Sequence, residues 1–138
     1  MAITKGIKEL CAEAEEIIET LSIEDAIGRH GDADTLFVDI RDIRELWRDG
    51  AVPGALHAPR GMLEFWVDPQ SPYHKDIFAS GKSFVLFCAG GMRSALAART
   101  IHEMGLEKVS HIAGGFGAWK KNGGPTEARE QPAPKPKD

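Results

Sequence analysis

One stretch sets the pattern for the rest of the chain: Phe84-Val85-Leu86-Phe87-Cys88-Ala89-Gly90-Gly91-Met92-Arg93-Ser94-Ala95-Leu96-Ala97-Ala98. An apolar run of strand length ends at Cys88, passes through two glycines and opens into an alanine-rich segment with helical periodicity. The stretch therefore predicts a strand, a tight loop and a helix.

The same stretch places a cysteine where a nucleophile can be activated. In such a turn the backbone N–H groups of residues 89–94 can surround the Cys88 sulfur, and the following helix points its positive end at the same place. Both effects favour the thiolate, which is the reactive form. The alternative is a cysteine that only fills core space. Gly90, Gly91 and Arg93 favour the nucleophile, because glycines allow close backbone approach and arginine supplies a fixed charge.

Three segments together resemble the single-domain rhodaneses. The loop Cys88-Ala89-Gly90-Gly91-Met92-Arg93-Ser94 is similar to that family's active-site pattern, Cys-x-x-Gly-x-Arg followed by Ser or Thr. Two further stretches are similar to the family's other signatures. The first is Val38-Asp39-Ile40-Arg41, followed by Glu45 and Gly50-Ala51-Val52-Pro53-Gly54-Ala55, and the second is Gly114-Gly115-Phe116-Gly117-Ala118-Trp119 with Gly124-Pro125. One departure is Ala51-Val52, where His-Ile is commoner before Pro-Gly. The resemblance covers Ile18 to Pro125.

This resemblance implies an α/β, three-layer fold with a central parallel five-stranded sheet and helices on both faces. Strands that alternate with helices along the chain also indicate a parallel sheet, with a site at the carboxyl ends of the strands. We expect an N-terminal helical extension over residues 1–17, a rhodanese-like domain over 18–125, and a disordered Pro/Lys-rich tail over 126–138. Periodicity alone leaves residues 18–21 open between helix and strand.

The reaction that the resemblance implies is sulfur transfer in two halves. Cys88 would attack the sulfane sulfur of a small donor such as thiosulfate, and the loop residues Ala89, Gly90, Gly91, Met92, Arg93 and Ser94 would bind the resulting persulfide. A thiophilic acceptor, cyanide in assays and a thiol or protein in the cell, would then take the sulfur. The resemblance implies neither a metal nor an organic cofactor.

Six further residues are weaker candidates for the site. Asp39 follows a predicted strand, where it could hold Arg41, Arg93 or the loop amides, although a plain salt bridge explains it equally well. His57 lies beside the Pro-Gly-Ala signature and is a candidate pocket neighbour. The resemblance places Arg60, Phe65 and Trp66 at the rim of the pocket, where aromatic residues more often pack than contact substrate. The other histidines lack zinc-site spacing, so we interpret them as surface or core residues.

Two other functions share this scaffold. Phosphatases and arsenate reductases with a cysteine loop carry one more residue between Cys and Arg, which widens the loop for a tetrahedral oxyanion. Four residues separate Cys88 from Arg93, so this loop suits a single sulfur atom. A non-catalytic rhodanese-like module that binds partners is the second alternative, although such modules usually lack the cysteine.

Composition indicates which cellular compartment and which classes of binding partner we expect. A formal net charge of -4 without a basic stripe argues against nucleic-acid binding. The cysteines, Cys11 and Cys88, are too few for a disulfide framework and suit a reducing compartment; Cys11 fits a buried helix stripe, as a packed thiol or as a resolving partner. We find no signal-peptide pattern and no apolar run of membrane-spanning length, so we predict a cytoplasmic protein without a membrane partner. Oligomeric state stays open.

Overall fold

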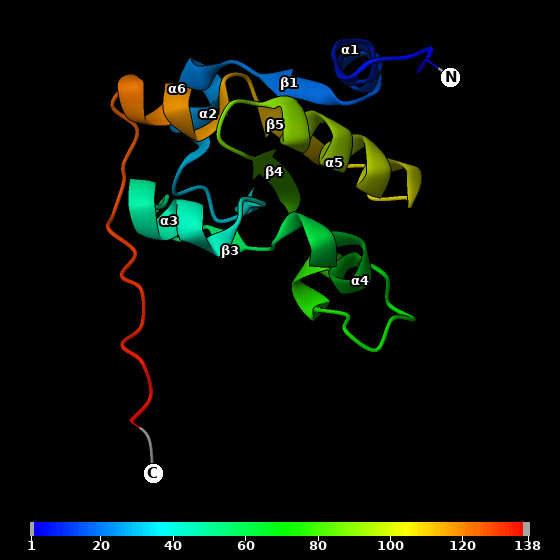
Figure 1. The fold of residues 1–138 in the computed structure, drawn as a ribbon. Coiled ribbons are helices and arrows are strands. Elements are labelled where there is room, and N and C mark those ends of the chain that lie inside the picture. Colours follow the sequence, from blue (N-terminus) through cyan, green and yellow to red (C-terminus); the bar gives the residue numbers. More distant parts are fainter. Residues whose placement is uncertain (1, 137–138) are drawn as a thin grey trace.

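The computed structural model describes residues 2–136, which form an α/β domain (Figure 1). The helices are α1 (Ile7–Ile17), α2 (Ile23–Arg29), α3 (Ile43–Asp49), α4 (Leu63–Val67), α5 (Met92–Glu103) and α6 (Gly115–Lys121). The strands are β1 (Glu19–Leu21), β2 (Thr35–Asp39), β3 (Leu56–His57), β4 (Ser83–Phe87) and β5 (Val109–Ile112). Two short 3-10 turns, η1 (Arg60–Met62) and η2 (Asp76–Ala79), lie between β3 and β4.

The sheet is parallel throughout and runs in the order β1-β5-β4-β2-β3. The central strand β4 is apolar at nearly every position, as expected of a strand covered on both faces. Its register pairs Phe87 with Asp39 on β2 and Leu86 with His111 on β5. The predicted five-stranded parallel sheet is therefore confirmed, with the end of β4 flanked by polar residues of both neighbours.

Helices cover both faces of the sheet (Figure 1). On one face α4, α5 and η2 close an apolar cluster that includes Leu63, Phe78 and Ala97. On the other face α2 and α6 close a second cluster around Phe37 and Trp119. Side chains of β4 alternate between these clusters, as the period of two along a strand requires. The three-layer arrangement predicted from the resemblance is thus confirmed.

Local sequence explains where several helices begin. Ser22 caps α2 by accepting a hydrogen bond from the Asp25 amide. Asp42 and Glu45 form a reciprocal capping box at the start of α3. The α3 helix ends at Gly50, whose φ of 95° is a backbone conformation that favours glycine.

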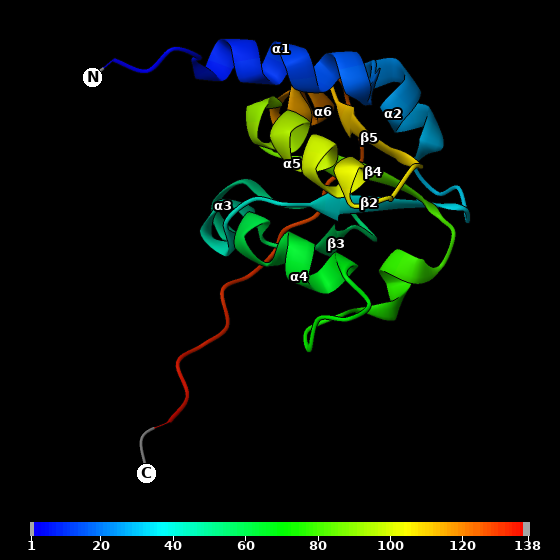
Figure 2. The ribbon, with the colours of Figure 1, turned by 90° about the vertical axis from the view of Figure 1, so that its right-hand side faces the viewer.

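The N-terminal helix α1 lies outside the sheet and packs on α5, to which it contributes Cys11 and Ala14 against Ala95 (Figure 2). It ends at Ile17, and residues Glu19–Leu21 pair with β5 as the edge strand β1. Sheet pairing therefore resolves the ambiguity in favour of a strand for Glu19–Leu21, while Ile18 caps the end of α1. None of the helices within residues 2–136 combines the length and apolarity needed to cross a bilayer.

Ordered contacts continue into the segment that follows Pro125. The Trp119 indole donates to the Pro125 carbonyl at 2.7 Å, and Glu127 forms two backbone hydrogen bonds with Ala51, at 2.8 and 2.9 Å. Beyond this bridge the chain leads away from the domain (Figure 2). The polar composition of the segment does not indicate the role of Glu127, because its bonds are made by the backbone.

Candidate active site

Cys88 directly follows β4 and lies on the face of the sheet covered by α4 and α5. Only 1% of its surface is exposed, whereas Ala89 and Gly90, the next two residues, are exposed. Period-two alternation explains the burial, since Phe84, Leu86 and Cys88 all point into the same cluster. The sulfur is therefore at the surface end of the core, below a loop that faces solvent.

The loop turns so that a backbone amide meets the sulfur. The Gly91 N–H donates to Cys88 Sγ at 3.2 Å. Gly91 has a φ of 109° and precedes the first residue of α5, Met92. This conformation favours glycine, and it aims the N-terminal end of a twelve-residue helix at the sulfur. Both features stabilise negative charge on a sulfur atom at this position.

A second polar group reaches Cys88 from the same helix. The Ser94 hydroxyl lies 3.6 Å from Cys88 Sγ and 2.8 Å from Nδ1 of His111. Ser94 is 0% exposed and His111 is 2% exposed. Burial lowers the pKa of His111, while the nearby Glu15 carboxylate acts in the opposite direction. Cys88 thus has a hydroxyl beside its sulfur, backed by a buried imidazole.

A glycine turn holds the loop from behind. The Phe116 and Gly117 amides donate to the carbonyls of Cys88 and Ala89, at 2.8 and 3.0 Å. Gly115, at φ 60°, lies so close that a Cβ there would be 2.8 Å from the Ala89 carbonyl group and would overlap the Cys88 carbonyl oxygen. The C-terminal glycine signature is therefore a support for the cysteine loop.

Arg93 is held by an acidic residue from α3. Its two terminal nitrogens donate to the two carboxylate oxygens of Glu45, each at 2.9 Å. The guanidinium lowers the pKa of Glu45, and the carboxylate raises the pKa of Arg93. In this arrangement the arginine links the loop to α3, and its planar fork is occupied.

Asp39 and Arg41 form a buried ion pair beside the loop. Both are 1% exposed; Arg41 Nη2 lies 2.7 Å from an Asp39 carboxylate oxygen and donates to the Gly50 carbonyl at 2.9 Å. The guanidinium carbon also lies 4.2 Å from the centre of the Phe116 ring. Of the three partners that the sequence suggested for Asp39, the structure places Arg41 on it.

The weaker candidates lie around this framework. His57 Nε2 is 2.7 Å from the Arg41 carbonyl oxygen. Arg60 pairs with Glu64 one turn later, at 2.6 Å. Phe65 is half exposed, and Trp66 packs against the cluster that contains Cys88. These hydrogen bonds and packing contacts are all with other parts of the protein. They therefore do not test whether the side chains line a pocket, and that role stays a prediction.

Three contributors to the site are not identified by sequence reasoning. His111 is interpreted there as a surface or core histidine, and His57 is favoured as the pocket neighbour. Glu45 and Gly115 enter only as members of two signatures. A histidine within the short segment Val109–Ile112 is an available signal, because a strand next to β4 brings its carboxyl end to the cysteine.

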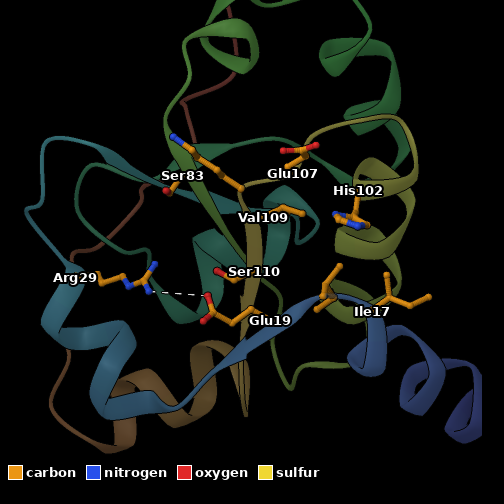
Figure 3. A pocket seen from close by; sticks show the side chains of 10 residues that line it. Ile17, Glu19, Arg29, Ser83, His102, Glu107, Val109 and Ser110 are labelled. Carbon is orange, nitrogen blue, oxygen red and sulfur yellow. Dashed lines mark ion pairs between the residues drawn. The ribbon is translucent and has the colours of Figure 1, made fainter.

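A cavity of about 410 Å³ lies at the opposite end of the sheet (Figure 3). It is lined by residues at the starts of strands, including Glu19, Ser83 and Val109, and by Arg29, which lies 3.9 Å from Glu19. Cys88 does not line it. This cavity is therefore separate from the cysteine loop.

Comparison with known proteins identifies a common domain. The family model described as a rhodanese-like domain matches residues 22–122. A sulfurtransferase from Allochromatium vinosum is 31% identical over 97 residues, covering 70% of this chain and 82% of that protein. A tRNA uridine(34) hydroxylase from Cronobacter sakazakii is 29% identical over 136 residues, and the match covers 96% of this chain. The chain spans about a third of that hydroxylase, 36% of its length.

Solved structures agree on the fold. A protein of unknown function from Rhodopseudomonas palustris, described as a possible tyrosine phosphatase, is 58% identical with a TM-score of 0.89, over 92% of this chain and 98% of that one. The polysulfide-sulfur transferase homodimer from Wolinella succinogenes is 28% identical with a TM-score of 0.67, over 88% of this chain and 87% of that one.

Proposed function

The chain belongs to the rhodanese-like domain family, and on that premise we propose that it is a sulfurtransferase that carries sulfane sulfur as a persulfide on Cys88. Similarity to a sulfurtransferase and to a polysulfide-sulfur transferase supports transfer of sulfur in general. The donor, the acceptor and the persulfide are parts of the proposal. Two free cysteines suit our further proposal of a cytoplasmic site of action.

In the first half of the reaction the Cys88 thiolate attacks the outer sulfur of a donor such as thiosulfate. A new S–S bond forms to Cys88, the S–S bond of thiosulfate breaks, and sulfite leaves with the bonding electron pair. The persulfide then carries its negative charge on the terminal sulfur. The Gly91 amide and the start of α5 lie where they stabilise anionic sulfur.

In the second half a nucleophilic acceptor attacks the terminal sulfur. The bond between the two sulfurs breaks, the acceptor keeps the sulfane sulfur, and Cys88 returns to the thiolate. Cyanide serves as such an acceptor in assays, and a thiol or a protein thiol serves in the cell. The two halves together move one sulfane sulfur from the donor to the acceptor. Because no electrons pass to or from a third compound, the reaction requires no redox cofactor.

One observation carries the proposal: the Gly91 amide donates to Cys88 Sγ within a loop of four residues between Cys88 and Arg93. A loop of this length surrounds one sulfur atom more closely than it surrounds a tetrahedral oxyanion. The outer sulfur of a persulfide on Cys88 would therefore lie beside a hydrogen-bond donor that is already in place.

The first experiment looks for the covalent intermediate. After incubation with thiosulfate and no acceptor, intact-protein and peptide mass spectra should show one added sulfur atom on the Cys88 peptide. Cyanide or a thiol should remove it. The Cys88→Ser variant should gain none, and Cys11→Ser should gain it as the wild type does. A wild-type protein that gains no sulfur from several sulfane donors would contradict the proposal.

A phosphatase is the second candidate, because the similar Rhodopseudomonas palustris protein is described as a possible tyrosine phosphatase. Two features speak against it. The loop is one residue short of the phosphatase length, and both terminal nitrogens of Arg93 bind Glu45 instead of facing a phosphate. We expect no hydrolysis of aryl phosphates. Turnover of such esters without a sulfur adduct would favour the phosphatase, and the absence of both would favour a binding module.

A further inference from the structure

A continuous row of polar side chains leads from the Cys88 sulfur to the protein surface. Ser94 Oγ lies 3.6 Å from Cys88 Sγ and 2.8 Å from His111 Nδ1. On the other side of the ring, His111 Nε2 lies 3.1 Å from Thr20 Oγ1, which donates to Glu15 Oε2 at 3.1 Å. The Glu15 side chain is 44% exposed, so the row ends in water.

The outer half of this row comes from the N-terminal part of the chain. Glu15 belongs to α1 and Thr20 to β1, and both precede residue 22, where the family match begins. Pairing of Thr20 with His111 in the sheet fixes one of these contacts. Packing of α1 on α5 through Ala14 and Ala95 fixes the other. The extension is thereby placed next to the buried imidazole.

We propose that Ser94, His111, Thr20 and Glu15 form a proton relay that carries the proton of the Cys88 thiol to solvent and leaves the thiolate stabilised. This inference rests on the proposed function in one respect, namely that sulfur transfer requires the thiolate as nucleophile. Cys88 is 1% exposed, and the relay supplies a path from its buried thiol to water.

The direction of each hydrogen bond follows from the proton count. Before ionisation the Cys88 thiol donates to Ser94, and Ser94 donates to His111 Nδ1 at 2.8 Å in preference to the Gly91 carbonyl at 3.3 Å. His111 Nε2–H then donates to Thr20, and Thr20 donates to the Glu15 carboxylate. As the proton leaves, each group passes on the hydrogen it held and receives one from the cysteine side. Glu15 gains the last proton and releases it to water.

After the proton has left, each hydrogen bond in the row is reversed and is donated toward the Cys88 sulfur. Thr20 donates to His111 Nε2, Nδ1–H donates to Ser94, and the Ser94 hydroxyl donates to the sulfur anion. The ring exchanges one neutral tautomer for the other and stays uncharged. Its lowered pKa agrees with that, because burial disfavours the imidazolium. The relay therefore changes charge only at Cys88 and Glu15.

The other titratable group of α1 on this side is Cys11. Its thiol lies 3.6 Å from the Met92 carbonyl oxygen, the acceptor to which it is directed. Its pKa is raised by burial, by Glu15 and by Cys88, so it remains a neutral thiol at pH 7. Cys11 therefore neither supplies nor removes a proton in the relay.

The test replaces the link nearest the surface. Thr20→Val keeps the shape of the side chain and removes the hydroxyl, whereas Thr20→Ser keeps the hydroxyl. A matched control, Thr100→Val, removes a hydroxyl that donates to the Leu96 carbonyl in α5, away from the row. The rate of Cys88 alkylation by iodoacetamide is followed against pH by mass spectrometry, and melting curves check the fold.

We expect Thr20→Val to slow alkylation at pH 7 by roughly tenfold or more, with its pH midpoint moved upward, because the hydroxyl that supports the inward-pointing arrangement is gone. Thr20→Ser and Thr100→Val should behave as the wild type. Thiosulfate loading of Cys88 should slow in Thr20→Val to a similar degree.

Two results would overturn the relay. In the first, Thr20→Val matches the wild type at every pH. In the second, Thr20→Val and Thr20→Ser are slowed equally, which assigns the residue a packing role. Because alkylation needs no sulfur donor, these results are separable from the proposed function: a wild type that never forms a persulfide rejects sulfur transfer and leaves the alkylation comparison intact.

Discussion

Arg93 binds Glu45 through both terminal guanidinium nitrogens, at 2.9 Å each. Glu45 also accepts the Asp42 amide at the start of α3, so a single carboxylate joins the helix cap to the cysteine loop. This link positions the loop through a charge pair. An anion can therefore bind the terminal nitrogens of Arg93 only if it displaces the bidentate Glu45 carboxylate.

Replacing that carboxylate should give a pH-dependent loss of stability. Arg93 lowers the pKa of Glu45, so the pair stabilises the protein above the ordinary glutamate pKa of about 4.3, and this contribution is lost as pH falls through the lower native value. Glu45→Gln should lower the free energy of unfolding by about 0.5 kcal/mol at pH 7, since Arg93 is partly exposed. The gap between variant and wild type should therefore be smaller in an acidic buffer at pH 3 than at pH 7. Urea titrations at both pH values measure it, and an equal gap at each would refute the assignment.

Activity should depend on one of the two cysteines. Cys88→Ser should abolish sulfur transfer, because an alcohol at this position cannot form a persulfide. Cys11→Ser should keep nearly all of it, since a serine hydroxyl can still donate to the Met92 carbonyl. Steady-state rates with thiosulfate and cyanide check both. Comparable losses in the two variants would indicate a relay of sulfur between two thiols.

The glycine turn should tolerate no side chain at Gly115. Gly115→Ala places a methyl group against the Cys88 and Ala89 carbonyls, and we expect a loss of about 3 kcal/mol or more in the free energy of unfolding, together with most of the activity. Gly123→Ala is the matched control, because its φ of 82° is also positive but nothing lies within 4 Å of the added carbon. That control should lose about 1 kcal/mol. Equal losses would show that backbone conformation, and not the collision, accounts for the effect.

Truncations should locate where the tail becomes dispensable. Deletion of residues 130–138 should leave the melting temperature unchanged, whereas deletion of 126–138 removes the two backbone bonds between Glu127 and Ala51. At about 1 kcal/mol per hydrogen bond, the longer deletion should lower the melting temperature by about 3–8 °C. Calorimetry on both proteins decides this. A shorter deletion that destabilises equally would place the contact elsewhere.

Much of the fold could be predicted because its signals are local. The β4 strand and the start of α5 follow from the continuous apolar run before Cys88 and from the glycines and alanine-rich segment after it. Residues 18–21 could not be assigned, since Ile18 and Leu21 suit a helix stripe and a strand alike. Pairing with β5 decides between them, and pairing is a long-range interaction that periodicity does not encode.

The candidate site divides in the same way. Cys88, the two glycines and the start of the following helix lie within seven consecutive residues, so the sequence alone is enough to predict this loop. The partners of that loop come from elsewhere: Glu45 is 48 residues from Arg93, and His111 is 17 residues from Ser94. The residues next to Glu45 and His111 in the sequence do not distinguish them from other surface or core residues. Their roles depend on strand order, which brings the ends of β5 and β2 to either side of β4.

The Phe116 and Gly117 amides occupy the carbonyls of Cys88 and Ala89, and so fix which way the peptide groups of the loop face. With these two carbonyl oxygens held by α6, the loop is fixed from behind, and the Gly91 N–H already donates to Cys88 Sγ. The conformational entropy lost in ordering these dipoles is lost once, when the chain folds. In the proposed reaction each cycle would then begin with a preorganised loop, and the barrier to sulfur capture would contain little reorganisation energy.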